Sequence, residues 1–309
     1  MLLLIPWAQT VFAQATPLPA EPVLRIETSA HNAPIRALDV DASGRYAVTA
    51  SEDKTARVWD LASGRLTQTL RPPVGAGNDG KLFASAITPD GAVVAVGGWS
   101  PGNDVYLFER AGGTMIQRIT GLPNTITSLT FSPDGQSLVV GLWGKHCIRS
   151  FSTASQWRGA STETGNDAQY DGEVTRARYT PDGRQLATAS ADGLVRVYDV
   201  AQRRLALLPR ARPAGGAQPF NLVYSPDGKL LASSFADSSA VTVLNAVTLQ
   251  TAYAPSIAGI GNGSLNALTW SADGRELLAA GTWKMADGSH GLRRWSDGGR
   301  GAATDIPLA

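Results

Sequence analysis

Residues 41–60, DASGRYAVTASEDKTARVWD, decide the fold. Residues 42–45 are polar and predict a tight turn, with Gly44 at the position that often requires a positive φ. The small and β-branched residues 46–51 then predict a strand, and residues 52–54 predict a second turn. Residues 56–59 alternate as a strand with one buried face does. The stretch therefore predicts two short strands joined by tight turns.

The turn at Gly44 recurs five more times along the chain. The Asp-Gly pairs that end at Gly91, Gly135, Gly183, Gly228 and Gly274 follow one another at intervals of 44–48 residues. One strand is predicted before each turn and two after it, and a weaker fourth strand follows. A nearly constant period of this length is typical of four-stranded units that repeat around a ring. The third strand of every unit carries a large apolar residue near its end, at Trp59, Phe108, Phe151, Tyr198, Leu244 and Trp295.

The third strands also carry a family signature. Residues 57–60 are Arg-Val-Trp-Asp and residues 196–199 are Arg-Val-Tyr-Asp. With these motifs the chain resembles the WD-repeat family over residues 23–309. The resemblance implies an all-β, WD-repeat β-propeller with six four-stranded repeats visible. Residues 23–29 and 301–309 both have the pattern of an outer fourth strand, which gives seven outer strands for six inner sets. We therefore expect part of a seven-bladed ring, incomplete at the C-terminus, whose remaining strands lie beyond Ala309. The alternative is a six-bladed ring in which one of these two outer segments is redundant.

The resemblance further implies a structural hydrogen-bond set in the first unit. His31, Asp53, Trp59 and either Ser51 or Thr49 match it by residue type and position. Such a set satisfies buried polar groups, so His31 is expected to support the fold and not to bind a ligand. The fourth unit keeps Asp192 and a Ser or Thr, but it has Tyr198 and no histidine.

The composition and the N-terminal residues limit the classes of protein to which the chain can belong. A net charge of +1 offers no basic field for nucleic acid, and the single cysteine, Cys147, excludes an intrachain disulfide. Residues 1–15 combine an apolar run with an A-x-A cleavage site and predict a signal peptide, followed by a linker over residues 16–22. The alternative to a signal peptide is a disordered apolar tail. The basic segment that precedes most signal sequences is missing, so the true start is expected upstream of Met1. We expect an exported, periplasmic or secreted monomer without a membrane span.

Motifs for chemistry are weak in this sequence. Residues 75–80 match G-x-G-x-x-G, but a strand and not a helix is predicted after them, which argues against a dinucleotide site. Residues 39–44 begin like a calcium loop, but position twelve is Ala50 and not Glu. His146 and Cys147 are adjacent in a predicted strand and would point to opposite faces. We therefore expect that the protein is not an enzyme and that it binds no metal and no cofactor.

These observations favour a non-catalytic scaffold that binds a protein or peptide through the loop-rich face of the propeller. Long loops are predicted over residues 72–81, 99–104, 153–173, 209–219 and 283–291. Three second-to-third-strand loops begin with a tryptophan, and we expect a partner-binding patch formed by Trp99, Trp143 and Trp283. The alternative is that each indole packs against the neighbouring blade.

Two other functions stay open. Residues 71–73, 77–81 and 294–297 are similar to those of exported bacterial WD-repeat proteins, some of which carry a caspase-like peptidase domain. This similarity implies a regulatory or recruiting propeller within a longer peptidase. Residues 270–274 lean instead toward a propeller enzyme or a Tol-type periplasmic assembly factor, although the three histidines of the chain are few for an enzyme.

Overall fold

The structure is a computed structural model of the chain, and it describes residues 29–201 and 205–308. The chain divides into two compact units, Met1–Ala30 and His31–Ala309. Only Ser29 and Ala30 of the first unit are described. The predicted signal peptide, the linker and nearly all of the strand expected over residues 23–29 therefore lie outside the described residues.

The second unit consists of six four-stranded antiparallel sheets, which we call blades 1 to 6 in chain order. Blade 1 contains β1 (Ile35–Val40), β2 (Tyr46–Ser51), β3 (Ala56–Asp60) and β4 (Arg65–Leu70), and blade 2 contains β5 (Leu82–Ile87), β6 (Val93–Gly98), β7 (Val105–Glu109) and β8 (Met115–Ile119). Blade 3 contains β9 (Ile126–Phe131), β10 (Ser137–Leu142), β11 (Ile148–Ser152) and β12 (Thr162–Asp167). A short 3-10 turn, η1 (Gly144–His146), precedes β11.

Blades 4 to 6 repeat the same order of strands. Blade 4 contains β13 (Val174–Tyr179), β14 (Gln185–Ser190), β15 (Val195–Asp199) and β16 (Ala206–Ala211). Blade 5 contains β17 (Pro219–Tyr224), β18 (Leu230–Phe235), β19 (Val241–Asn245) and β20 (Thr251–Tyr253). Blade 6 contains β21 (Ala267–Trp270), β22 (Leu277–Lys284), β23 (His290–Trp295), the 3-10 turn η3 (Asp297–Gly299) and β24 (Ala303–Leu308). The pairing of β24 with β23 confirms the fourth strand predicted within residues 301–309.

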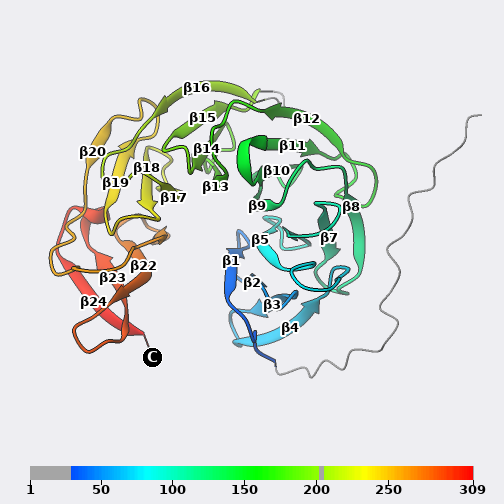
Figure 1. Cartoon of the computed structure of the whole chain (residues 1–309), viewed down its shortest axis with the longest axis horizontal. Helices are drawn as coiled ribbons and strands as arrows, with labels where there is room; N and C mark the ends of the chain where they lie inside the picture. Colours follow the sequence, from blue (N-terminus) through cyan, green and yellow to red (C-terminus); the bar gives the residue numbers. More distant parts are fainter. Residues whose placement is uncertain (1–28, 202–204, 309) are drawn as a thin grey trace, which may run out of the picture. The chain divides into compact units, whose positions relative to one another are not determined.

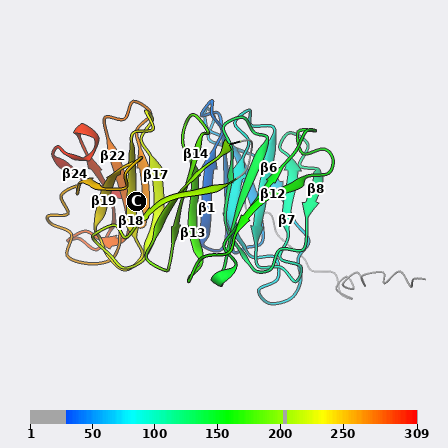
Figure 2. The same cartoon turned by 90° about the horizontal axis from the view of Figure 1, so that it is seen from above.

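Neighbouring blades pack through their first strands. β1 packs on β5, β5 on β9, β9 on β13, β13 on β17 and β17 on β21. Within this unit the blades follow one another in an arc, with blade 1 (blue) and blade 6 (red) at its two ends (Figure 1), and the strands of neighbouring blades run in about the same direction (Figure 2). Among the described residues, no element of blade 6 packs closely on an element of blade 1. The structure is thus an all-β propeller with six blades.

The recurring glycine shapes each turn between the first and second strands. Gly44, Gly91, Gly135, Gly183, Gly228 and Gly274 have φ between 68° and 72°, a region that favours glycine. In blade 2, the Gly91 N–H donates to the Thr88 carbonyl at 2.8 Å, and the Thr88 hydroxyl donates to Asp90 at 2.6 Å. The positive φ predicted from the Asp-Gly pattern is confirmed.

In blades 2 to 6, the large residue of the third strand packs toward the preceding blade. Phe108 belongs to a core cluster with the residues of blade 1, and Trp295 belongs to one with the residues of blade 5. Five of the six residues in this row are at most 7% exposed: Phe108, Phe151, Tyr198, Leu244 and Trp295. Trp59 in blade 1 is only partly buried, because none of the described blades precedes blade 1.

The two end blades each expose an apolar face. Leu38 on β1 is 56% exposed, whereas Leu129 at the same distance from the turn in blade 3 is 1% exposed. On the other side, Leu292 on β23 is partly exposed, whereas Val241 at the same place in blade 5 is 1% exposed. Both exposed faces are the surfaces that neighbouring blades bury elsewhere in the propeller.

Three predicted loops overlap strands, and the one predicted over residues 283–291 begins in β22 and ends in β23. The segment predicted as a loop over residues 153–173 contains β12, which pairs with β11 through backbone hydrogen bonds. The loop predicted over residues 209–219 begins within β16. Strands β12 and β16 lie at the outer edge of a blade, where they pair on one side only and carry weaker apolar alternation.

Candidate functional site

Two tryptophans are exposed at equivalent positions of neighbouring blades. Trp99 follows β6 and Trp143 follows β10, and they are 45% and 50% exposed. Each backbone N–H donates to the carbonyl just before the first strand of its own blade, Trp99 to Lys81 and Trp143 to Thr125, both at 2.9 Å. Because the same hydrogen bond fixes the backbone of both residues at the same edge of their sheets, the two residues lie on the same face of the propeller. We call them the Trp99–Trp143 patch.

Trp283 does not belong to this patch, so its predicted role in partner contact is wrong. In blade 6 the residue that donates to the loop before the first strand is Thr282, whose N–H bonds the Ser264 carbonyl at 3.1 Å. Trp283 comes one residue later, and successive residues of a strand point to opposite faces. Its indole is 2% exposed and covers Gly291, where it leaves no room for a Cβ. The alternative of packing within the fold therefore holds for Trp283.

A charged group occupies the equivalent position in blade 1. The Glu52 N–H donates to the Pro34 carbonyl at 3.1 Å, as Trp99 and Trp143 do in their blades. The Glu52 carboxylate accepts hydrogen bonds from Lys81 Nζ at 2.8 Å and from Arg36 Nε at 2.6 Å. These bonds, from Lys81 first and then Arg36, lower the pKa of Glu52. The patch is therefore bordered by paired charges, and Lys81 links this network to the backbone of Trp99.

The structural set predicted in blade 1 is formed, with Thr49 at its centre. His31 Nδ1 lies 2.8 Å from Asp53 Oδ2, and His31 Nε2 lies 2.8 Å from Thr49 Oγ1. Trp59 Nε1 donates to the same Thr49 oxygen at 2.9 Å. Ser51 is not the bridging hydroxyl: it donates to the Ala33 carbonyl at 3.0 Å and accepts from the Asp53 N–H at 3.1 Å. Of the two hydroxyls considered for this set, Ser51 and Thr49, the structure places Thr49 in it and not Ser51.

Blade 4 builds a related set with a residue that the sequence patterns did not indicate. Tyr170 takes the place of the missing histidine, and its hydroxyl lies 2.7 Å from Thr188 Oγ1 and 2.8 Å from the Tyr198 hydroxyl. Tyr198 in turn donates to Asp167 at 2.8 Å. Burial raises the pKa of Tyr170 above its ordinary value. A tyrosine before the first strand could have been found by searching that position for any residue able to donate a hydrogen bond.

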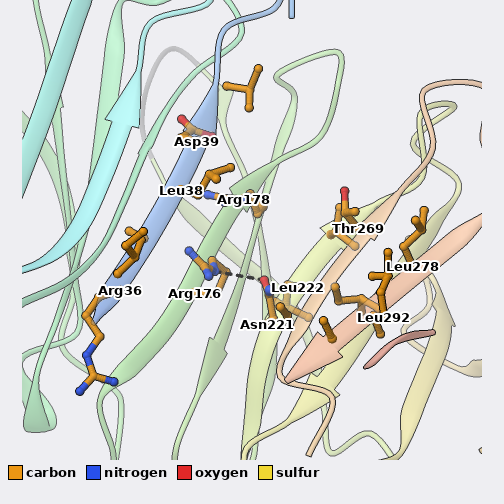
Figure 3. Close-up of a pocket in the computed structure, with 18 residues that line it drawn as sticks. Arg36, Leu38, Asp39, Arg176, Arg178, Asn221, Leu222, Thr269, Leu278 and Leu292 are labelled. Atoms are coloured by element: carbon orange, nitrogen blue, oxygen red, sulfur yellow. Dashed lines mark hydrogen bonds between the residues drawn. The ribbon is translucent and has the colours of Figure 1, made fainter. Parts of the chain in front are cut away.

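A cavity of about 710 Å³ lies between the first strands of blades 1, 4 and 5 and the first three strands of blade 6. Its walls are of two kinds. Apolar side chains such as Leu38, Leu278 and Leu292 line the sides that belong to blades 1 and 6 (Figure 3). Polar side chains line the part between β1, β13 and β17, namely Arg36, Asp39, Arg176, Arg178 and Asn221 (Figure 3).

The remaining motifs carry no site. A strand, β5, follows the G-x-G-x-x-G run at residues 75–80, as expected. Cys147 is buried with its Sγ donating to the Lys145 carbonyl, and burial raises its pKa, whereas the adjacent His146 is exposed. Within residues 29–201 and 205–308, no three His, Cys, Asp or Glu side chains are grouped to hold a metal ion. In the same residues, no helix is long and apolar enough to cross a membrane.

Comparison with known proteins agrees with the arrangement of the strands. The family described as "WD domain, G-beta repeat" matches residues 22–60, 113–151 and 163–199. The chain carries WD40 repeats. The second and third of these matches start in or just before the fourth strand of one blade and end with the third strand of the next. The resemblance to the WD-repeat family is thereby confirmed.

The chain is similar to several WD-repeat proteins over part of their length. It is 27% identical to WD repeat-containing protein SL1-17 of Schistosoma mansoni over 57% of this chain and 54% of that protein. It is 29% identical to an uncharacterized WD repeat-containing protein of Synechocystis, over 55% of this chain and 46% of the relative. It is 26% identical to the small ribosomal subunit protein RACK1 of Candida albicans, over 82% of this chain and 75% of that protein. The chain thus spans about half the length of the first and second of these relatives.

Proposed function

We propose that this WD40 propeller is a non-catalytic interaction scaffold that binds a protein or peptide through the Trp99–Trp143 patch. The observation that carries the proposal is the exposure of two indoles, 45% and 50%, at one backbone position of neighbouring blades. Tryptophan is enriched among the residues that dominate binding energy, because it combines a large apolar surface with one hydrogen-bond donor. The expected partner presents apolar side chains to the indoles and polar groups to the charges around Glu52.

The family supports this proposal in general terms. WD-repeat propellers typically mediate protein interactions, and one relative is named as a protein of the small ribosomal subunit. A net charge of +1 gives the chain no strong electrostatic attraction for nucleic acid, which favours a protein partner. The fold alone does not name the partner.

The test is partner capture with variants of the patch. The double variant Trp99→Ala/Trp143→Ala should lose the partners that the wild-type chain captures by crosslinking in its host. The melting temperature should stay nearly unchanged, because both indoles are largely in solvent. The matched control is Leu61→Ala/Val247→Ala, which removes two exposed apolar side chains from blades 1 and 5. Equal capture by both double variants and the wild type would contradict the proposal.

We also propose that a seventh four-stranded sheet fills the space between blades 6 and 1 in the working protein. Leu38 and Trp59 on one side and Leu292 on the other occupy rows that other blades bury. The family match over residues 22–60 begins well before β1, where the other matches contain the fourth strand of a preceding blade. A seventh sheet would bury both apolar faces at once and remove two exposed sheet surfaces.

Export is part of the scaffold proposal, whereas a further domain belongs only to one of its alternatives. Residues 1–15 support a signal peptide, and sequencing the N-terminus of the mature protein would find a start at residue 16. The alternatives, a regulatory propeller of a caspase-like peptidase or a Tol-type assembly factor, rest on the sequence similarities described above. Either would place the Trp99–Trp143 patch in contact with a protein.

A further inference from the structure

The polar wall of the cavity carries two arginines on one strand. Arg176 and Arg178 are two residues apart on β13, so their side chains leave the strand on the same side. Both line the cavity, with Asp39 of β1 on one side and Asn221 of β17 on the other (Figure 3). This wall lies on the first strands, toward the middle of the arc of blades (Figure 1).

The two guanidinium groups are only partly satisfied by the protein. Arg176 Nε donates to Asn221 Oδ1 at 3.1 Å, and Arg178 Nη1 donates to the Ala177 carbonyl at 3.3 Å. Among the described residues, no carboxylate lies within 4.0 Å of either group. Asp39 is nearby, but its Oδ2 accepts the Ile87 N–H at 3.0 Å. Since each guanidinium has five N–H donors, most of them remain available to the cavity.

The charge on this wall is not balanced. Burial first, and then repulsion from Arg178, lower the pKa of Arg176 to about 9, while Asp39 acts in the opposite direction. Burial likewise raises the pKa of Asp39, although Arg178 and Arg176 oppose it. Besides Arg36, which is paired with Glu52, two guanidinium groups therefore face one carboxyl group in a partly enclosed space. A buried charge of this kind favours a counter-ion that brings its own hydrogen-bond acceptors.

We propose that Arg176 and Arg178 form an oxyanion site that binds a carboxylate or phosphate group from solution. The planar fork of a guanidinium matches the oxygens of either group, and two forks on one side of a strand can hold one anion between them or two groups of one ligand. The site goes beyond the proposed scaffold function, since it uses none of the residues of the Trp99–Trp143 patch. It is also separate from the apolar walls that a seventh sheet would cover.

The test is calorimetric titration of the full chain with inorganic phosphate and with succinate at constant ionic strength. At least one of the two should bind, which identifies the group that the site prefers. Arg176→Gln and Arg178→Gln should each weaken that binding by about tenfold or more, because a hydrogen bond to a charged group contributes that much affinity. Arg184→Gln, an exposed arginine of the same blade, makes the same change in net charge and should bind as the wild type does.

Asp39→Asn keeps the proposal testable if an arginine variant fails to fold. The asparagine oxygen can still accept the Ile87 N–H, but the competing negative charge is gone, so binding of the preferred anion should tighten by about threefold or more. The proposal is overturned if neither anion binds below about 10 mM, which is weaker than a specific site would give. It is also overturned if Asp39→Asn leaves the affinity unchanged, or if Arg184→Gln weakens binding as much as Arg176→Gln.

Discussion

Thr49 holds two side chains of blade 1 through a single hydroxyl. It interacts with His31 Nε2 at 2.8 Å and accepts from Trp59 Nε1 at 2.9 Å. Thr49→Val keeps the shape but leaves both ring nitrogens without this partner, so we expect a loss of about 1–3 kcal/mol in the free energy of unfolding. Ser51→Ala, which leaves this pair of bonds intact, should cost less. Urea denaturation of the two variants measures the difference, and equal losses would contradict the central place of Thr49.

The sequence could not distinguish Thr49 from Ser51. The two residues are separated by one position on β2 and so point to the same side of the strand. Which hydroxyl meets the indole depends on the direction in which Trp59 leaves β3, and that direction is set by tertiary packing. By contrast, the pairing of His31 with Asp53 could be predicted, because the family pattern specifies both residue types and their spacing.

Two aspartates with buried side chains, Asp53 and Asp192, make the stability of the fold depend on pH in the acid range. Burial alone would raise the pKa of Asp53, but hydrogen bonds from Thr55 and His31 outweigh it and lower the pKa; Arg196 and nearby backbone N–H groups do the same for Asp192. A carboxylate with a lowered pKa in the folded state stabilises the fold above its unfolded pKa, near 4. This stabilisation is lost as the pH falls from about 5 toward the folded-state values.

The melting temperature should therefore fall between pH 5 and pH 3, and Asp53→Asn should flatten this decline. Thermal melts across this range provide the measurement, with Asp199→Asn, an exposed carboxylate at the end of β15, as the control. If the melting temperature falls equally steeply between pH 5 and pH 3 in the wild type and in Asp53→Asn, Asp53 does not contribute in this way.

At the scale of elements, the order of the strands could be predicted, but the face of β22 to which Trp283 points could not. Each blade could be located because Asp-Gly turns and third-strand aromatics recur at a fixed spacing. In blades 2 and 3 the tryptophan comes eight residues after the turn glycine, and in blade 6 it comes nine residues after it. That single residue moves Trp283 to the opposite face of β22, where it is buried. The exposure of Trp99 and Trp143 could be predicted because both come eight residues after the turn glycine of their blade.

The third-strand aromatics should differ in their contribution to stability according to their neighbours. Trp295 is fully buried against blade 5 and donates to the Ser256 carbonyl at 2.7 Å, so Trp295→Ala should cost about 3–5 kcal/mol. Trp59 is only partly buried within the described residues, so in this chain without a seventh sheet Trp59→Ala should cost less, about 2–3 kcal/mol. Denaturation curves of both variants decide the order. A larger loss for Trp59 would indicate that its face is covered in solution.

At the scale of the whole propeller unit, the repeat could be predicted but its closure could not. Repeats specify contacts between neighbouring blades, because every blade presents the same two faces. Closure depends on which surface meets the first and last faces, and no local pattern encodes that. In the structure, Leu38 is exposed and Leu292 is partly exposed, whereas their counterparts in other blades are buried. No described sheet therefore covers the first and the last face.

The seventh-sheet proposal predicts the reactivity of a thiol placed on β1. In Leu38→Cys the new thiol should be protected from a thiol reagent in the protein purified from its host, because a seventh sheet would cover it. Val247→Cys, on an exposed turn of blade 5 that no neighbouring sheet would cover, should react at the rate of a free thiol. Rapid labelling at both positions would show that the face of blade 1 stays open.

The most direct test of the scaffold function is oxidative footprinting of the tryptophans by mass spectrometry, with and without the captured partner. In the protein alone, Trp99 and Trp143 should be oxidised rapidly, while Trp157, Trp283 and Trp295 should be protected by burial. Addition of the partner should protect Trp99 and Trp143 together and leave the rates at the other positions unchanged. Continued rapid oxidation of both indoles in the saturated complex would contradict binding through this face.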